Sequence, residues 1–240
     1  MKIIFLGTPE FVQSIKQELS KHFTLVNSLE EADLAVIAAY GHILTKTELQ
    51  KPKYGSINVH PSLLPKYRGP SPIQSAILNG DKTSGITIIK IDEEVDHGPI
   101  IYQETLELSD MDNFEVLSKK MFQRSAEILP KIIEDFIAGK ITPQPQDHTK
   151  TTHCEILTRE SGFFDINTPP DSQTLDRMIR AYHPWPGVWT QFRPSGSKGQ
   201  AKIVKFLPEG LLQMEGKKAI SVKDFLNGYP DFPLKDFLVL

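Results

Sequence analysis

The first half of the chain alternates short apolar runs with amphipathic segments, a pattern typical of α/β proteins. Residues 2–6 form an apolar run that ends at a Gly-Thr-Pro turn, and apolar positions then recur at helical spacing from residue 11 to residue 19. The same reading predicts further strands at residues 23–26, 34–38, 55–60, 84–90 and 99–108. Further helices are expected at residues 45–50, 72–78 and 111–138, with Pro130 kinking or splitting the last one. Strand–helix–strand order at the start favours a nucleotide-binding-like α/β fold.

The pattern changes near residue 185. Residues 175–182 predict a helix, and from residue 188 onward short strands are separated by turns. These strands are expected at residues 189–192, 201–206, 211–214 and 219–221. We therefore expect a main domain at residues 1–184 and a small β-rich domain at residues 185–240.

Composition adds limits rather than a function. The chain has 240 residues, of which 39% are hydrophobic and 24% charged, and these shares are ordinary for a globular protein. A net charge of −3 argues against bulk basicity as a means of holding nucleic acid, although it allows a local basic patch. The single cysteine, Cys154, excludes an intramolecular disulfide and favours a reducing, cytoplasmic location. No apolar run is long enough for a membrane span, so we expect no membrane partner.

Two polar residues stand in the predicted strand 55–60. Because side chains alternate along a strand, Asn58 and His60 emerge on one face and Ile57 and Val59 on the other. Strands inside α/β sheets normally bury apolar residues on both faces, so polar residues there are costly. They are either satisfied core groups or a catalytic pair, in which the amide donates to a developing oxyanion and the imidazole moves a proton.

Three loops are candidates for contacts with ligands. Residues 38–44 form either a loop that a flat ligand can approach or a plain strand-to-helix connection. Lys66 and Arg68 stand in an irregular segment that is either solvated or in contact with an anion. Residues 92–98 are acidic and end at a glycine, but they lack the ligand alternation of a calcium loop.

Together these residues resemble the formyltetrahydrofolate-dependent formyltransferases. Asn58-Val-His60, the following Ser62-Leu-Leu-Pro-Lys-Tyr-Arg-Gly69 and the later Asp96-x-Gly98 match that family's Asn/His/Asp triad in order and spacing. Further segments are similar to the methionyl-tRNA formyltransferases within it: Phe5-Leu-Gly-Thr-Pro-Glu-Phe11, Ala39-Tyr-Gly41, Pro72-Ile-Gln74, Arg180-Ala-x-x-Pro-Trp-Pro186 and residues 216–228. The resemblance implies a Rossmann-like formyltransferase core with a mostly parallel sheet, plus the small β-rich C-terminal domain.

The resemblance also implies a set of site residues. Asn58, His60 and Asp96 would be catalytic, with 10-formyltetrahydrofolate as co-substrate and no metal. The pterin of the folate would lie against Ala39, Tyr40, Gly41, Ile43, Leu44 and Val95. Substrate contacts would come from Thr8, Ser62, Leu63, Leu64, Pro65, Lys66 and Arg68.

The sequence leaves two kinds of amine as candidate acceptors of the formyl group. The resemblance implies initiator methionyl-tRNA, with no stable protein partner. However, residues 26–33 run directly to the next strand where those enzymes carry a long basic loop that contacts tRNA. Amino sugars linked to nucleotides are therefore the alternative acceptors. A non-catalytic folate- or RNA-binding module is a third reading, against which the intact Asn/His/Asp set argues.

Overall fold

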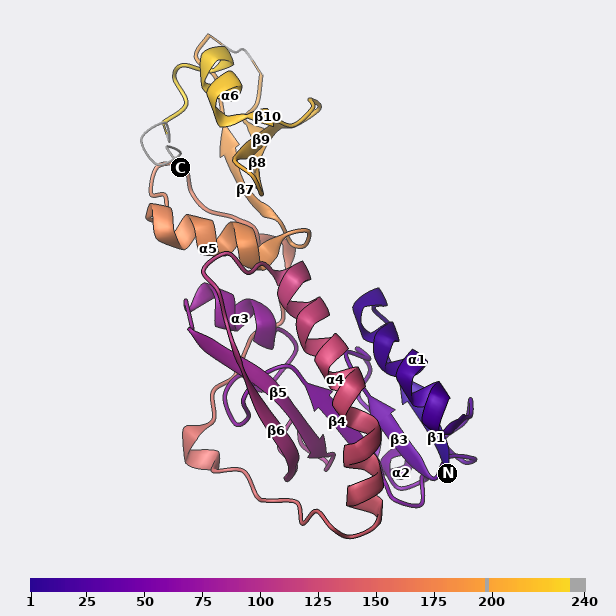
Figure 1. Ribbon diagram of the computed structural model, residues 1–240. Coiled ribbons are helices and arrows are strands. Elements are labelled where there is room, and N and C mark those ends of the chain that lie inside the picture. The colour runs from indigo at the N-terminus through magenta and orange to yellow at the C-terminus, as the bar shows by residue number, and fades with distance from the viewer. Residues whose placement is uncertain (197–198, 234–240) are drawn as a thin grey trace. The chain divides into compact units, whose positions relative to one another are not determined.

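The computed structural model describes residues 1–196 and 199–233, which form two compact units (Figure 1). The first unit comprises residues 1–76, 81–111 and 115–156, and the second comprises residues 77–80, 112–114 and the described residues from 157 onward. The predicted boundary at residue 184 lies inside the second unit, directly before its first strand. The division at residues 184 and 185 stays a prediction.

A six-stranded sheet organises the first unit, in the order β2-β1-β3-β4-β5-β6. The strands β1 to β4 are mutually parallel, whereas β5 runs antiparallel to both β4 and β6. This confirms the expected mostly parallel sheet. The strands are β1 (Lys2–Leu6), β2 (Thr24–Leu25), β3 (Leu34–Ile37), β4 (Ser56–His60), β5 (Thr83–Lys90) and β6 (Ile100–Glu107).

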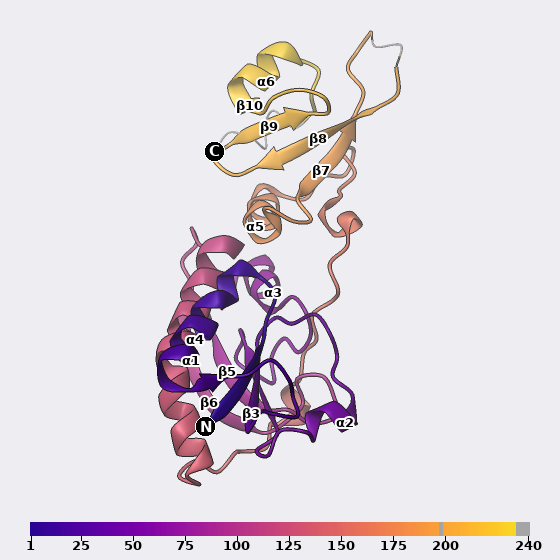
Figure 2. The ribbon, with the colours of Figure 1, turned by 90° about the vertical axis from the view of Figure 1, so that its right-hand side faces the viewer.

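Two helices cover one face of this sheet, α1 (Gln13–His22) and α4 (Phe114–Ile137), and they lie side by side (Figures 1 and 2). The rings of Phe11 and Phe122 stack between them with centroids 5.3 Å apart. Pro130 lies inside α4, which continues as one helix, so of the two expected outcomes the split was wrong and the kink stays a prediction. A proline removes one backbone donor, and burial of its ring with the apolar face of α4 compensates part of that loss.

Short elements complete the first unit. The four-residue helix α2 (Lys46–Leu49) begins at Thr45, whose side chain accepts from the backbone N–H of Glu48 in the predicted capping box. The helix α3 (Pro72–Leu78) follows β4, and 3-10 turns occur at Glu10–Val12 and His148–Lys150. After α4 the chain becomes extended, and residues 144–154, which we call the strap, pair with Ile100 at one end and with Arg68 at the other.

The second unit has its own sheet and core. Four antiparallel strands lie in the order β10-β9-β8-β7, which confirms a small β-rich C-terminal unit. The ring of Phe232 meets those of Phe192 and Phe225 at centroid distances of 4.9 and 5.1 Å, and α6 carries Phe225 into this core. The elements are a 3-10 turn (Arg159–Gly162), α5 (Ser172–Tyr182), β7 (Val188–Phe192), β8 (Lys202–Leu207), β9 (Leu211–Met214), β10 (Ile220–Ser221) and α6 (Val222–Gly228). Within the described part of the chain, no helix combines the length and apolarity that crossing a membrane requires.

Candidate active site

The carboxyl ends of three parallel strands bring the first candidate residues to one edge of the sheet. Leu6 is level with Ile37, and Ile37 is level with Asn58. The segments that leave β1, β3 and β4 therefore start side by side, as ligand-binding loops do in open α/β sheets. Thr8 ties two of them together, because its hydroxyl donates to the carbonyl of Tyr40 over 3.0 Å.

Asp96 reaches the same edge from the loop between β5 and β6. Its Oδ1 accepts from Asn58 Nδ2 at 3.1 Å, and its Oδ2 accepts from the backbone N–H of Gly69 at 2.9 Å. The same Oδ2 lies 3.5 Å from Nδ1 of His60. The structure thus brings together the three predicted catalytic residues, and their side chains contact one another directly.

The backbone at this point is specialised. Asp96 has a φ of 50°, a left-handed conformation that costs a residue other than glycine about 1 kcal/mol. Gly69, its donor, has a φ of 113°, and a Cβ there would lie 2.8 Å from the carbonyl oxygen of Cys154. Gly98 also requires the absence of a side chain, because a Cβ would lie 1.8 Å from the carbonyl oxygen of Lys90. Both glycines are therefore needed for the close approach of the loops.

His60 is held at both edges of its ring. It is only 3% exposed, and Nε2 lies 2.8 Å from the carbonyl oxygen of Tyr67. A carbonyl can only accept, so Nε2 carries a hydrogen. The 3.5 Å contact between Nδ1 and Asp96 is longer than an ordinary hydrogen bond. Nδ1 is consequently the ring nitrogen that can turn to a substrate atom.

The segment after β4 is firmly anchored. Ser62 is fully buried and its hydroxyl donates to the carbonyl of Lys66. The N–H of Leu64 donates to Thr87 at 3.1 Å, and its carbonyl accepts from Gln103 at 2.9 Å. Of the predicted substrate-binding residues, Ser62 and Leu64 are therefore buried parts of the loop's framework. Leu63 lies between these two residues and Pro65 follows Leu64, and both are half-buried.

Lys66 and Arg68 already have partners in the protein. Nζ of Lys66 lies 2.6 Å from Asp81, and the hydroxyl of Tyr67 donates to the same carboxylate at 2.9 Å. Burial tends to lower the pKa of Lys66, but the hydrogen bonds and charge interactions with Asp81 and Tyr67 together outweigh it and raise that pKa. Burial raises the pKa of Tyr67, and Asp81 raises it further. Arg68 is only 6% exposed, so of the two cations Lys66 is the one at the surface.

The sequence did not predict that the strap belongs to this site. Arg68 donates to Oε1 of Gln146 from both Nε and Nη2, and Nη2 also donates to Nδ1 of His148 at 2.8 Å. Thr152 accepts from the backbone N–H of Tyr67 at 2.9 Å. Cys154 is buried, and burial raises the pKa of its thiol, so this cysteine is a packing residue here. The strap residues stand in a polar stretch without periodicity, which gives no signal of burial.

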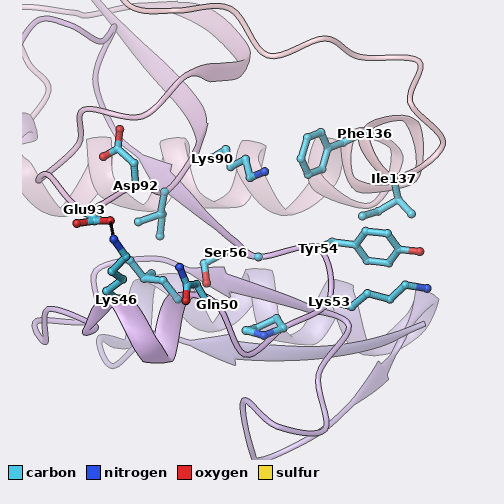
Figure 3. Close-up of a pocket in the computed structure, with 14 residues that line it drawn as sticks. Lys46, Gln50, Lys53, Tyr54, Ser56, Lys90, Asp92, Glu93, Phe136 and Ile137 are labelled. Atoms are coloured by element: carbon cyan, nitrogen blue, oxygen red, sulfur yellow. Dashed lines mark ion pairs between the residues drawn. The ribbon is translucent and has the colours of Figure 1, made fainter.

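A pocket of about 550 Å³ is lined by α2, the start of β4 and the segment at the end of β5 (Figure 3). Ser56 contributes to its wall and, two residues before Asn58, points to the same face of β4. The Ser56 hydroxyl is buried and has no hydrogen-bond partner. At one end of the pocket Lys46 and Glu93 form an ion pair 2.5 Å long. The other lining residues are Leu49, Gln50, Pro52, Lys53, Tyr54, Gly55, Lys90, Ile91, Asp92, Phe136 and Ile137.

None of the six predicted folate-contacting residues lines this pocket. The structure places Ala39, Tyr40, Gly41, Ile43 and Leu44 in the loop after β3, at the sheet edge that also holds Asn58. Ile43 is 78% exposed and Val95 is 56% exposed, which is high for apolar side chains. The pocket instead uses residues just beyond these two segments, in α2 and after β5.

Comparison with known proteins identifies the family of the chain. A model of the formyl transferase family matches residues 8–133. The methionyl-tRNA formyltransferase of a Roseiflexus species (strain RS-1) is 45% identical over 161 residues, which cover 67% of this chain and 49% of that protein. The methionyl-tRNA formyltransferase of Listeria monocytogenes serotype 4a (strain HCC23) is 42% identical over 235 residues, covering 79% of this chain and 75% of that protein. The chain spans about half the length of the first of these relatives.

A solved structure shares the fold at lower identity. The sugar N-formyltransferase of a Shewanella species is 19% identical, with a TM-score of 0.67 over 91% of this chain and 99% of that one. At this identity the likeness concerns the fold alone. The fold is therefore compatible with enzymes that act on different amines.

Proposed function

The chain belongs to the formyl transferase family, and on that premise we propose that it transfers a formyl group from 10-formyltetrahydrofolate to the amino group of initiator methionyl-tRNA. The observation that carries the proposal is the convergence of Asn58 and His60 on Asp96 at the edge of the sheet. An amide donor, an imidazole and a carboxylate are the groups that acyl transfer between two nitrogens requires.

The pocket suits the pterin end of a folate. Its volume of about 550 Å³ lies in the usual range for a small-molecule site. The buried Ser56 hydroxyl lacks a partner, and a heterocycle rich in N–H and carbonyl groups would supply one. Asp92 and Gln50 provide further polar groups in the wall. The exposed Ile43 and Val95 lie within three residues of lining residues in the sequence and would offer apolar contacts to the rest of the folate.

The three triad residues divide the chemistry. When bound, 10-formyltetrahydrofolate supplies the electrophilic formyl carbon. Asn58 would donate to the formyl oxygen as negative charge develops there. His60 would act in its protonated form, with a hydrogen on both ring nitrogens, and would turn Nδ1 from Asp96 to donate to the same oxygen. Asp96, which only accepts hydrogen bonds when ionised, would take the proton that the attacking amine must lose, directly or through a water. A proton would in turn pass to N10 of the folate as its bond to the formyl carbon breaks, so that tetrahydrofolate leaves. No covalent enzyme intermediate is needed.

The identity of the amine that accepts the formyl group is the more specific part of the proposal. Relatives at about 40% identity are methionyl-tRNA formyltransferases by name, and this supports the tRNA amine. Lys66 is the exposed cation beside the triad and would bind a phosphate of the substrate. To do so, its ammonium group would have to leave the Asp81 carboxylate. Removing Lys66 should then raise the KM for the acceptor and reduce its salt dependence. Arg68, enclosed by the strap, would act on the loop rather than on phosphate.

The acceptor can be tested directly. Purified protein and 10-formyltetrahydrofolate are offered either methionyl-tRNA of the initiator type or a panel of dTDP- and UDP-linked amino sugars. We expect the formyl group on the methionine amine. Transfer to the sugars alone would replace the tRNA acceptor with a nucleotide-linked amino sugar. Absence of transfer to every amine, with the protein folded, would refute the enzyme proposal.

A further inference from the structure

Gln146 is the strap residue whose side chain donates to the backbone of the loop that carries Asp96, and the ring of His148, two residues later, stacks on His97 of that loop. Nε2 of Gln146 donates to the backbone carbonyls of Asp96 and Gly98, each at 2.8 Å. Its Oε1 accepts from Nε of Arg68 at 3.2 Å and from Nη2 at 2.7 Å. The side chain is only 5% exposed. A single buried amide therefore connects the strap to the loops on both sides of the triad.

Every hydrogen-bonding position of this amide is used. A primary amide offers two N–H donors and two lone pairs on its oxygen, and Gln146 has two acceptors and two donors around it. The orientation is fixed, because a flipped amide would place its NH₂ against the guanidinium of Arg68 and its oxygen against two carbonyls. No other side chain of this length both donates twice and accepts twice.

The other anchors of the Asp96 loop to the strap and to α2 act through side chains: the His97 ring stacks on His148 with centroids 4.3 Å apart, and Glu93 pairs with Lys46. Glu93, Glu94 and Val95 just before Asp96 are exposed, so this stretch contributes little burial of its own. Asp96 also holds a left-handed backbone conformation that an unrestrained chain leaves readily. The carboxylate contacts to Asn58 and Gly69 fix the end of the side chain, whereas Gln146 fixes the backbone from which it projects.

We propose that Gln146 is a positioning residue for the reaction, which holds the backbone of Asp96 and Gly98 so that the Asp96 carboxylate faces Asn58 and His60. This inference rests on the proposed formyl transfer. It gives Arg68 a defined part, since the buried guanidinium holds Oε1 of Gln146 and so turns Nε2 toward the Asp96 loop. It assigns the strap a part in turnover rather than in folding alone.

The sharpest variant is Gln146→Glu. A carboxylate keeps the contact with Arg68, but it places an oxygen against the carbonyls of Asp96 and Gly98 in place of two donors. The matched control is Gln144→Glu on the same strap, whose exposed side chain donates to the carbonyl of Thr142. We expect kcat to fall about tenfold or more in Gln146→Glu, with KM for the folate within about threefold of wild type. Gln144→Glu should keep wild-type values. Wild-type kcat in Gln146→Glu would overturn the proposal.

Two further measurements separate positioning from a general loss of structure. In an Asp96→Asn background, Gln146→Glu should lower kcat by less than about twofold, because the carboxylate that it positions is already gone. Additive losses would contradict the proposal. Hydrogen exchange needs no substrate: peptides covering residues 91–99 should exchange faster in Gln146→Glu than in Gln144→Glu, while the strands β1 and β3 keep their protection. Unchanged exchange would refute the positioning role even if wild-type protein transfers no formyl group, so the two proposals can fail separately.

Discussion

At the scale of single residues, the Asp96 carboxylate is shared among three neighbours. It accepts from a side-chain amide and a backbone N–H, and it faces an imidazole. This arrangement explains why a polar face on β4 is tolerated: Asn58 and His60 are satisfied by partners that come from other segments. The two readings of these residues, core groups or catalytic pair, thus have the same local geometry. Only activity distinguishes them.

Asp96→Asn provides that distinction with little change in shape. The variant keeps one oxygen for Asn58 or Gly69 but replaces the other with a donor, and it cannot take a proton from an amine. We expect kcat to fall about a hundredfold or more, and Asn58→Ala and His60→Ala to cost about as much. Glu94→Gln, an exposed neighbour in the same loop, is the control and should leave kcat unchanged. Near wild-type turnover in all three triad variants would reject the mechanism.

At the scale of elements, local signals in the sequence were sufficient for most of the fold. The strands of the first sheet follow from apolar runs, and the capping box of α2 follows from Thr45 and Glu48. The helix α6 was not predicted, although Ser221 and Asp224 form the same kind of N-terminal signal. The parts that escaped prediction depend on distant contacts. Gln146 is buried because of Arg68 and Asp96, and nothing in its neighbouring residues indicates this.

The N-terminal cap of the short helix α2 can be removed to test whether this helix shapes the pocket. Thr45 and Glu48 exchange backbone and side-chain hydrogen bonds, and Lys46 between them pairs with Glu93 at the pocket's end. Thr45→Ala removes the cap, which should cost about 1 kcal/mol of unfolding free energy. We also expect a higher KM for the folate at unchanged kcat. Thr47→Ala, the same substitution at an exposed position of α2, is the control for denaturation and kinetics. An equal effect of both variants would contradict the expectation.

At the scale of the whole molecule, each of the two units has a separate hydrophobic core. The triad and the pocket belong to the first unit, and the aromatic cluster around Phe225 belongs to the second. The net charge of −3 provides no general attraction to nucleic acid, so any tRNA contact must rely on local groups such as Lys66. The chemistry and the choice of acceptor are therefore separate questions for this chain.

Binding of the folate should be visible in one unit. A ligand present at about a hundred times its Kd stabilises the form that binds it by about 2.7 kcal/mol. We expect tetrahydrofolate to slow hydrogen exchange in residues 43–60 and 91–98 and to leave the β7–β10 sheet unchanged. Exchange measured with and without the ligand, peptide by peptide, checks this. Protection confined to the β7–β10 sheet would place the folate elsewhere.

The residues of the candidate site and the strap are far apart in the sequence, and this separation determines the order in which the parts of the site are synthesised. Asn58 and Asp96 are 38 residues apart, and Gln146 comes a further 50 residues after Asp96. During synthesis from the amino terminus, every strand of the first sheet is therefore made before the residue that fixes the Asp96 loop. A nascent chain can therefore contain all six strands of the first sheet before Gln146 is available to fix the Asp96 loop. On the proposed mechanism, catalytic competence would therefore appear late in synthesis, once the strap has been made.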